Sequence, residues 1–391
     1  MECRLSKRME SFSSSVFSEI AQYKTELRKQ GKDIIDLSIG SPDMAPPAYL
    51  KHTLSELCLD DSMYGYTMKG TREFHDAVAS YYERSHGVEL DPDSEIMQLM
   101  GSQDGLVHLP MAFADPGDLV LVPDPGYTAY ATGIAMAGAI PYHMPLLKEN
   151  GFLPHFPSIP DDIAGRAVMM ILNYPGNPIP AMASEAFFRK AIAFAKKHNI
   201  LIVHDFAYSE LYYGGSRPIS FLSVDGAKDI GIEMNSLSKS FNLAGCRVAY
   251  AAGSQPILNA LQMLKSNLDY GVFEPIQTTA AKALLDGDPF SEANRAMYKR
   301  RRDALVTGLN EIGWEIPVPE AGMFVWAPIP CTYTSKEFTY KLMLEAGVAV
   351  TPGSAFGPSG EGYIRMALVQ DEAALRTAVE RITECHHALH L

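Results

Sequence analysis

The most constraining feature of the sequence is a strand–helix–strand pattern between residues 167 and 203. Ala167–Leu172 and Ile200–Val203 are continuous apolar runs, which is typical of strands buried on both faces of a sheet. Between them, Ser184 can cap a helix with an apolar stripe at positions i, i+4, i+7 and i+8, starting at Phe187. Such a unit builds a parallel sheet with helices on both faces.

Further segments extend this unit in both directions. Leu119–Val122 and Gly231–Met234 are candidate strands of the same sheet. Toward the C-terminus we expect helices over about 289–312, near 335–346 and from about 371, and strands over 323–326, 348–350 and 363–367. The prediction is an α/β fold, with a mostly parallel sheet flanked by helices in a large domain and a smaller α+β domain.

The expected domain organisation has three parts. Residues 1–45 form an N-terminal arm, whose helix over about 12–30 packs with the small domain. Residues 46–285 form the large domain that carries the site, and residues 286–391 form the small C-terminal domain. No internal repeat and no low-complexity linker separates them.

Composition limits the classes of partner. A net charge of −13 argues against nucleic acid, whose phosphates the protein would repel. No apolar run reaches the roughly 20 residues that a membrane span needs. The five cysteines are scattered and odd in number, so neither a disulfide framework nor a zinc site is expected, and a reducing cytoplasm is the simplest location. The basic run Lys299–Arg302 is expected to be a solvated helix face.

Polar residues close three of the expected central strands. Asn173, Asp205 and Ser236 each stand at the end of an expected strand. Ligands of open α/β sheets bind at the carboxyl ends of strands, because loops and helix N-termini meet there. Any one of these residues alone is more typical of an ordinary turn, but together they predict one pocket.

The segment Ser236–Arg247 indicates what that pocket binds. A lysine beyond a buried strand, here Lys239, can form an imine with an aldehyde when its amine is partly neutral. Ser236, Ser238 and Arg247 surround it with donors suited to a phosphate, and arginine can bind phosphate oxygens in pairs. An aldehyde and a phosphate on one small molecule indicate pyridoxal 5′-phosphate (PLP).

Asp205 and Tyr208 meet two further needs of that cofactor. A carboxylate beside the pyridine nitrogen keeps the nitrogen protonated, since an opposite charge favours the charged form. The protonated ring then accepts electrons from the substrate's α-carbon. Tyr208 lies three residues after Asp205, close enough along the chain to reach the phenolic oxygen of the ring.

With these residues in view, the chain resembles the fold-type I, class I and II aminotransferases over nearly its whole length. Ser236–Arg247 resembles the family's Schiff-base signature, and Asn173–Pro178 resembles its Asn-Pro-x-Asn-Pro turn. Bacterial aspartate and LL-diaminopimelate aminotransferases are the most similar members. The resemblance implies that Asn177 and Tyr208 bond the ring oxygen, and that Asp205 holds the ring nitrogen.

The same resemblance implies roles for residues outside these two motifs. The cofactor-binding set is completed by Gly101, Ser102 and Gln103 on the phosphate, by Tyr127 stacked on the ring, and by Tyr66 reaching the neighbouring subunit's phosphate. Substrate carboxylate contacts are implied for Gly40, Asn177 and Arg365, of which Arg365 offers a bidentate grip. Backbone N–H groups of the 101–103 turn suit a phosphate at a helix N-terminus on physical grounds alone.

The sequence departs from the family pattern in three places. The turn continues with Ile179-Pro180 where Thr-Gly is usual, so that loop is expected to take another path. Cys246 stands where a tryptophan is often found. The register for the intersubunit tyrosine falls on Gly65, which leaves Tyr64 and Tyr66 as alternatives, with Tyr66 favoured.

The resemblance implies a PLP-dependent aminotransferase that moves an amino group between an L-amino acid and a 2-oxo acid, with glutamate and 2-oxoglutarate as one pair. Lys239, Asp205 and Tyr208 are the implied catalytic residues. A homodimer with shared active sites is implied, in which residues 270–275 cross into the neighbour's site or stay buried in one subunit. A β-eliminating carbon–sulfur lyase and a non-catalytic PLP-binding regulator remain as alternatives, and the donor amino acid is open.

Overall fold

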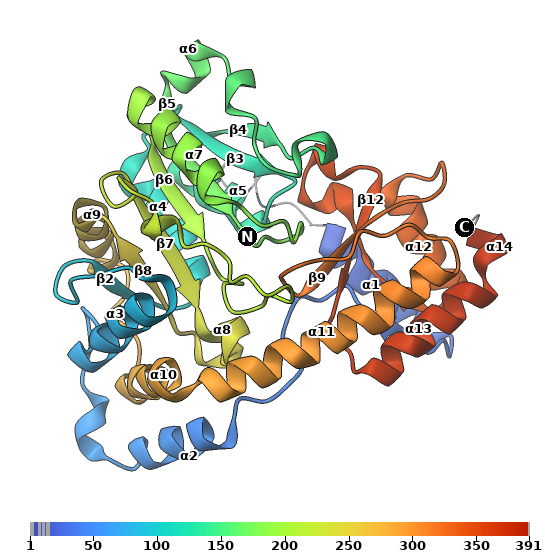
Figure 1. The fold of residues 1–391 in the computed structure, drawn as a ribbon, viewed down its shortest axis with the longest axis horizontal. Helices are drawn as coiled ribbons and strands as arrows, with labels where there is room; N and C mark the ends of the chain where they lie inside the picture. Colours follow the sequence, from blue (N-terminus) through green and yellow to red (C-terminus); the bar gives the residue numbers. More distant parts are fainter. Residues whose placement is uncertain (1–3, 7–8, 10–11, 13–15, 390–391) are drawn as a thin grey trace.

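A seven-stranded sheet forms the centre of the computed structural model, which describes residues 4–6, 9, 12 and 16–389 (Figure 1). The strand order is β2-β8-β7-β6-β5-β3-β4. Its strands are β2 (Ile96–Leu99), β3 (Leu119–Asp124), β4 (Ile140–Pro145), β5 (Ala167–Asn173), β6 (Leu201–Asp205), β7 (Gly231–Ser236) and β8 (Ala249–Gly253). β8 runs opposite to the other six strands, which confirms the expected mostly parallel sheet.

Helices cover both faces of this sheet. They are α2 (Ala48–Leu57), α3 (Arg72–His86), α4 (Ser102–Phe113), α5 (Thr128–Ala137), α6 (Asp161–Ala164), α7 (Glu185–His198), α8 (Leu237–Ser240), α9 (Gln255–Lys265) and α10 (Glu274–Asp286). Alternate residues of one strand point to opposite faces, so Leu121 belongs to the core cluster that includes residues of α3, α7 and α10, while Val120 belongs to the one that includes residues of α4, α5 and α9. Because β3 and β5 are buried on both faces, they read as apolar runs, whereas the edge strand β4 is mostly exposed.

The predicted helix after β5 forms as α7. The hydroxyl of Ser184 accepts the N–H of Phe187 at 3.2 Å and caps the helix. Phe187 and Ala191 are buried on the predicted stripe, and Asn199 ends the helix in the left-handed conformation. The expected strand–helix–strand unit is therefore confirmed.

The C-terminal part has its own small sheet, β11-β12-β9, which is antiparallel. Its elements are α11 (Asp288–Glu311), β9 (Phe324–Pro328), α12 (Ser335–Glu345), β10 (Val348–Ala349), β11 (Thr351–Pro352), β12 (Tyr363–Ala367), α13 (Glu372–Glu384) and α14 (His386–Leu389). Figure 1 shows α11 running from the vicinity of α8 and α10 to α13. The predicted boundaries at residues 45 and 285 stay predictions.

The N-terminal helix α1 (Val16–Lys29) lies against this C-terminal part (Figure 1). Its Ile20 and Leu27 form a buried cluster with Met343 of α12 and Ala349 of β10. None of the helices in the described part of the chain is long and apolar enough to cross a membrane.

Between α1 and α2 the chain forms the short strand β1 (Ile35–Asp36), which pairs with β10. One expectation about local structure was wrong. Within the basic run, Arg301 and Arg302 are buried rather than solvated. Arg301 makes a two-pronged ion pair with Asp43 at 2.7 Å, and Arg302 donates to the carbonyl of Pro319.

Candidate active site

The carboxyl ends of three adjacent strands bring the predicted polar residues together. Asn173 of β5 lies opposite Asp205 of β6 in the sheet, and Ser236 closes the next strand, β7. A cavity of about 460 Å³ opens at this edge. Of the predicted site residues, it is lined by Gly40, Ser102, Gln103, Tyr127, Asn177, Asp205, Tyr208, Ser236, Ser238, Lys239 and Arg247.

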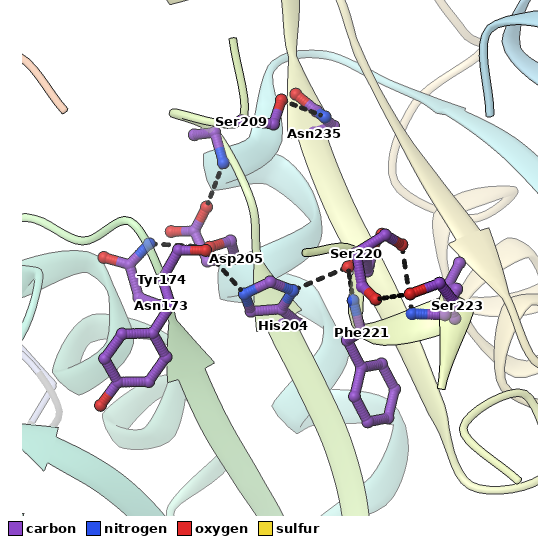
Figure 2. Close-up of polar contacts among 12 residues, drawn as sticks. Asn173, Tyr174, His204, Asp205, Ser209, Ser220, Phe221, Ser223 and Asn235 are labelled. Atoms are coloured by element: carbon purple, nitrogen blue, oxygen red, sulfur yellow. Dashed lines mark hydrogen bonds and ion pairs between the residues drawn. The ribbon is translucent and has the colours of Figure 1, made fainter. Parts of the chain in front are cut away.

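Asn173 shapes the wall of this cavity and does not line it. Its amide donates to the carbonyl of Asp205 at 2.7 Å, and its Oδ1 accepts the N–H of Asn177 at 2.8 Å. Figure 2 shows Asn173 lying beside Asp205. The following turn is tight, since a Cβ at Gly176 would stand 2.6 Å from the Asn173 carbonyl. This turn presents the side chain of Asn177 to the cavity.

Asp205 is a buried carboxylate with few partners. Its Oδ2 accepts the hydroxyl of Tyr130 at 2.8 Å, and its Oδ1 accepts the N–H of Ala207 at 3.3 Å. Burial raises the pKa of Asp205, and these two hydrogen bonds offset the rise only in part. A carboxylate can accept about four hydrogen bonds, so Asp205 keeps room for a donor from the cavity.

Lys239 lies on α8, which begins directly after β7. The hydroxyl of Ser236 caps this turn by accepting the N–H of Ser238 at 3.1 Å. The Lys239 ammonium has one hydrogen bond, to the carbonyl of Gly40 at 2.7 Å. Burial, assisted by the charges of Arg365 and Arg247, lowers the pKa of Lys239 to about 8. A larger share of the amine is therefore neutral near physiological pH than for an ordinary lysine.

A group of hydrogen-bond donors lies at the start of α4. Gly101 precedes the helix with φ at +85°, and a Cβ there would stand 2.1 Å from Nη2 of Arg247. Only glycine allows the arginine to approach the turn this closely. With Ser102, Ser236 and Ser238 also in place, hydroxyl groups, a guanidinium and a helix N-terminus surround one end of the cavity. This donor set fits a phosphate.

Arg365 of β12 lies in a second cavity of about 330 Å³, which shares Gly40, Tyr127 and Asn177 with the first. Its guanidinium donates to Oδ1 of Asn177 at 2.8 Å and to the carbonyl of Ser38 at 2.7 Å. Burial lowers its pKa to about 10, so it stays charged at neutral pH. A buried cation with so few anionic neighbours suits a substrate carboxylate.

Tyr127 and Tyr208 line the first cavity from different sides. The hydroxyl of Tyr127 donates to Oε1 of Gln103 at 3.3 Å, and its ring meets that of Tyr130 edge-on. Tyr208 is buried, which raises its pKa, and a hydrogen bond with Asn177 acts in the opposite direction. Asn177 and Tyr208 therefore lie within hydrogen-bond distance of each other. That both bond one oxygen of the cofactor ring stays a prediction.

Tyr66 lies apart from the other predicted residues. It is 84% exposed and lines neither cavity. Its ring centroid lies 5.1 Å from that of Tyr270, while Tyr64 contacts Phe273 at 5.2 Å. Within the described part of one chain, therefore, neither tyrosine lines the cavity that holds the phosphate-like donor set.

Tyr130 is a site residue that the sequence reasoning missed. It lies on α5, three residues after Tyr127, the N-cap residue of that helix, and the two rings meet at 5.7 Å; this spacing was the available signal. Ser41, Ala207, Ala244 and Gly245 also line the first cavity without having been predicted.

Comparison with known proteins agrees with this geometry. A family model described as aminotransferase class I and II matches residues 32–382. An LL-diaminopimelate aminotransferase of Syntrophobacter fumaroxidans is 45% identical over 368 residues, which is 94% of this chain and 95% of that protein. A protein of the same name from Dehalococcoides mccartyi is 43% identical over 97% of this chain and 98% of its own length.

Solved structures show the same fold over almost the whole chain. Substrate-bound BacF from Bacillus subtilis superposes with a TM-score of 0.92 at 37% identity, covering 98% of both chains. An aspartate aminotransferase mutant of Thermus thermophilus gives a TM-score of 0.91 at 28% identity, covering 98% of this chain and all of that one. The predicted fold class is confirmed by these neighbours.

Proposed function

Because this chain belongs to the class I and II aminotransferase family, it transfers amino groups, and we propose that it does so with PLP bound at Lys239. The family is PLP-dependent. The observation that carries the proposal is one cavity that holds Lys239, Asp205 and a phosphate-like donor set together.

The residues of the cavity fit each functional group of PLP. The partly neutral amine of Lys239 suits the aldehyde, and the donors around Gly101 and Arg247 suit the phosphate. Asp205, with unused acceptor capacity, suits the ring nitrogen, and Asn177 with Tyr208 suits the ring oxygen. When bound, PLP supplies an electron-accepting ring that stabilises negative charge at the substrate's α-carbon.

The remaining chemistry belongs to the protein's own side chains. Arg365, whose Nη atoms also donate to Asn177 and Ser38, binds the α-carboxylate and so fixes the orientation of the α-carbon. Nζ of Lys239 takes the proton from the α-carbon as a general base and returns it as a general acid. A pKa of about 8 suits both tasks, because neither protonation state of the amine is scarce near neutral pH. The carboxylate of Asp205 holds a proton at the ring nitrogen.

We propose the substrates from the names of the relatives. Several relatives at 41–45% identity carry the name LL-diaminopimelate aminotransferase. We propose LL-diaminopimelate as the first donor to test, with glutamate and 2-oxoglutarate as the pair on the other side. The unpaired cysteines in the described part of the chain support a reducing cytoplasm as the location.

A homodimer completes the proposal. Tyr64, Tyr66, Tyr270 and Phe273 are exposed aromatic side chains that contact one another in two pairs, and we call them the aromatic rim. Exposed aromatic groups of this kind mark protein interfaces. A second copy of the chain would cover the aromatic rim, and Tyr66 would donate to the phosphate in the neighbouring site.

The first experiment records visible absorbance and then adds single amino acids without any 2-oxo acid. We expect a yellow protein that bleaches with glutamate and LL-diaminopimelate, while Lys239→Ala shows neither the band nor turnover. An unbleached protein that releases pyruvate and ammonia from cystathionine would instead indicate β-elimination. Absence of a yellow band after PLP addition would overturn the assignment.

The pKa of Lys239 gives a second test of the same assignment. Only the neutral amine reacts with the aldehyde, so PLP uptake by the apoprotein should accelerate with rising pH around a midpoint near 8. The measurement is the rate of band formation between pH 6 and 10. A midpoint above pH 10 would mean that Lys239 is not the reacting amine.

A further inference from the structure

A buried lysine on α9 lies outside both cavities. Lys265 ends α9, and only 2% of its surface is exposed. Its ammonium bonds to Oδ2 of Asp104 and to Oδ2 of Asp269, each at 2.5 Å. A buried charge persists only when it is paired, so this ammonium and its two carboxylates hold one another in place.

Asp104 connects this ammonium to the phosphate-like donor set. It is the third residue of α4, and its Oδ2 also accepts the N–H of Met100 at 2.9 Å. Its Oδ1 bonds to Nδ1 of His108 at 2.8 Å. Burial raises the pKa of Asp104, but hydrogen bonds from His108 and Lys265 outweigh it and keep the pKa low. The ionised Asp104 therefore fixes the backbone just before the turn at Gly101.

Asp269 connects the same ammonium to the aromatic rim. Its Oδ1 accepts the N–H of Gly271 at 3.0 Å. Gly271 pairs with Thr67, and a Cβ at Gly271, whose φ is +95°, would stand 2.2 Å from the Thr67 carbonyl. The hydroxyl of Thr67 donates to the carbonyl of Val272 at 2.5 Å. Directly beside this junction, Tyr66 contacts Tyr270.

We propose that Lys265 is a positioning residue that couples the phosphate turn of its own subunit to the segment that presents Tyr66 to the neighbouring subunit. This inference rests on the proposed PLP site and homodimer. Two carboxylates in a poorly solvated place repel each other unless the cation lies between them. The position of each carboxylate, and of the backbone it holds, thus depends on the same ammonium.

A purely structural role makes a different prediction. If Lys265 only stabilised the end of α9, its removal would weaken all binding in the cavity alike, or none of it. A positioning role is specific to the phosphate, because both backbone segments held by the cluster lead to phosphate donors. Pyridoxal, which lacks the phosphate, therefore separates the two roles.

The experiment titrates the full-length apoprotein with PLP and, separately, with pyridoxal. For Lys265→Met we expect the dissociation constant for PLP to rise about 10- to 100-fold, the range for charged hydrogen bonds, while that for pyridoxal changes less than about 2-fold. The matched control is Lys282→Met, which breaks an exposed Lys–Asp pair of the same spacing and should change neither. Equal changes for both ligands, or no change, would overturn the proposal.

A second set of variants guards against misfolding of Lys265→Met. The triple variant Lys265→Met, Asp104→Asn, Asp269→Asn removes all three charges together and should show the same phosphate-specific loss. The single variants Asp104→Asn and Asp269→Asn should have non-additive effects on PLP binding, because one ammonium joins them. Additive effects would mean two independent ion pairs. A wild-type protein that fails to bind PLP would refute the proposed function instead.

Discussion

Two carboxylates on neighbouring strands, Asp205 of β6 and Glu233 of β7, are both buried, yet their pKa values shift in opposite directions. Burial raises the pKa of each. For Glu233, hydrogen bonds and the charge of His204 then reverse the shift, so that its pKa ends below the ordinary value. For Asp205 the pKa stays above it. Burial alone therefore does not determine the state of a carboxylate.

The number of partners explains the difference. Glu233 accepts four hydrogen bonds, from His204, Tyr82, Ser220 and the N–H of Phe221. The second nitrogen of His204 faces the carbonyl of Tyr174 at 3.1 Å, as Figure 2 shows.

Asp205 has two donors and no directly bonded cation. A carboxylate whose acceptor sites are filled holds the fold together. A carboxylate with free acceptor sites is available to a ligand.

The largest expected effect is on the reaction rate, and it comes from removing the charge of Asp205, the carboxylate with free acceptor sites. Asp205→Asn should lower the rate of the amino-acid half-reaction about 1,000-fold, since a preorganised charge beside the ring is lost. Ionising Asp205 costs stability above its unfolded pKa, so the Asn apoprotein should resist urea as well as wild type or better. Stopped-flow absorbance measures the rate of the half-reaction, and urea titration measures the stability of the apoprotein. A stability loss in the apoprotein would contradict the comparison.

The second-largest effect is expected on the free energy of unfolding, when Glu233 loses its charge. Glu233→Gln leaves His204 without its anion and should reduce the free energy of unfolding by about 3 kcal/mol at pH 7. The lowered pKa of Glu233 contributes stability at neutral pH that is lost in acid, so the difference from wild type should shrink below about pH 4. Urea unfolding at several pH values measures this. The folded fraction should keep a near-normal half-reaction rate, and a 100-fold slower rate would place Glu233 in the chemistry.

The smallest effect should come from a single donor to Asp205. Tyr130→Phe removes the 2.8 Å hydrogen bond and should raise the pKa of Asp205 further. A hydrogen bond to a charged group contributes about 1.5–3 kcal/mol, so PLP affinity should fall by about 10-fold or more. Phe replaces Tyr at nearly equal volume, and titration of the apoprotein measures the change. Unchanged affinity for PLP would show that the hydrogen bond from the N–H of Ala207 to Asp205 is sufficient for cofactor binding.

The local features of the fold and of the site could be predicted from the sequence. The apolar runs ending in Asn173, Asp205 and Ser236 were readable because strand burial and polar termination are encoded within a few residues. The hydrogen-bond and ion-pair partners of the site residues could not be predicted. Tyr130 lies 75 positions from Asp205, and Asp104 lies 161 positions from Lys265. Such contacts depend on how helices pack across the sheet, and one sequence does not determine them.

The same limit explains the wrong prediction for Lys299–Arg302. A basic run on a helix is typical of a solvated face, and Lys299 and Arg300 are exposed. Arg301 is buried by its pair with Asp43, which lies 258 positions away. The sequence contains both residues without indicating that they meet.

The two adjoining cavities also bear on how such an enzyme changes over evolutionary time. The first is lined only by residues between 40 and 247, whereas the second adds Phe17, Ile20 and Ala21 of α1 together with Phe356 and Arg365. With the cofactor proposed to lie in the first, we expect substitutions at Phe17, Ala21 or Phe356, which line only the second, to alter the choice of amino acid more than cofactor binding. Selection can thus act on substrate preference and on the catalytic machinery separately. Gene duplicates of this chain are free to diverge in what they accept while inheriting the same chemistry.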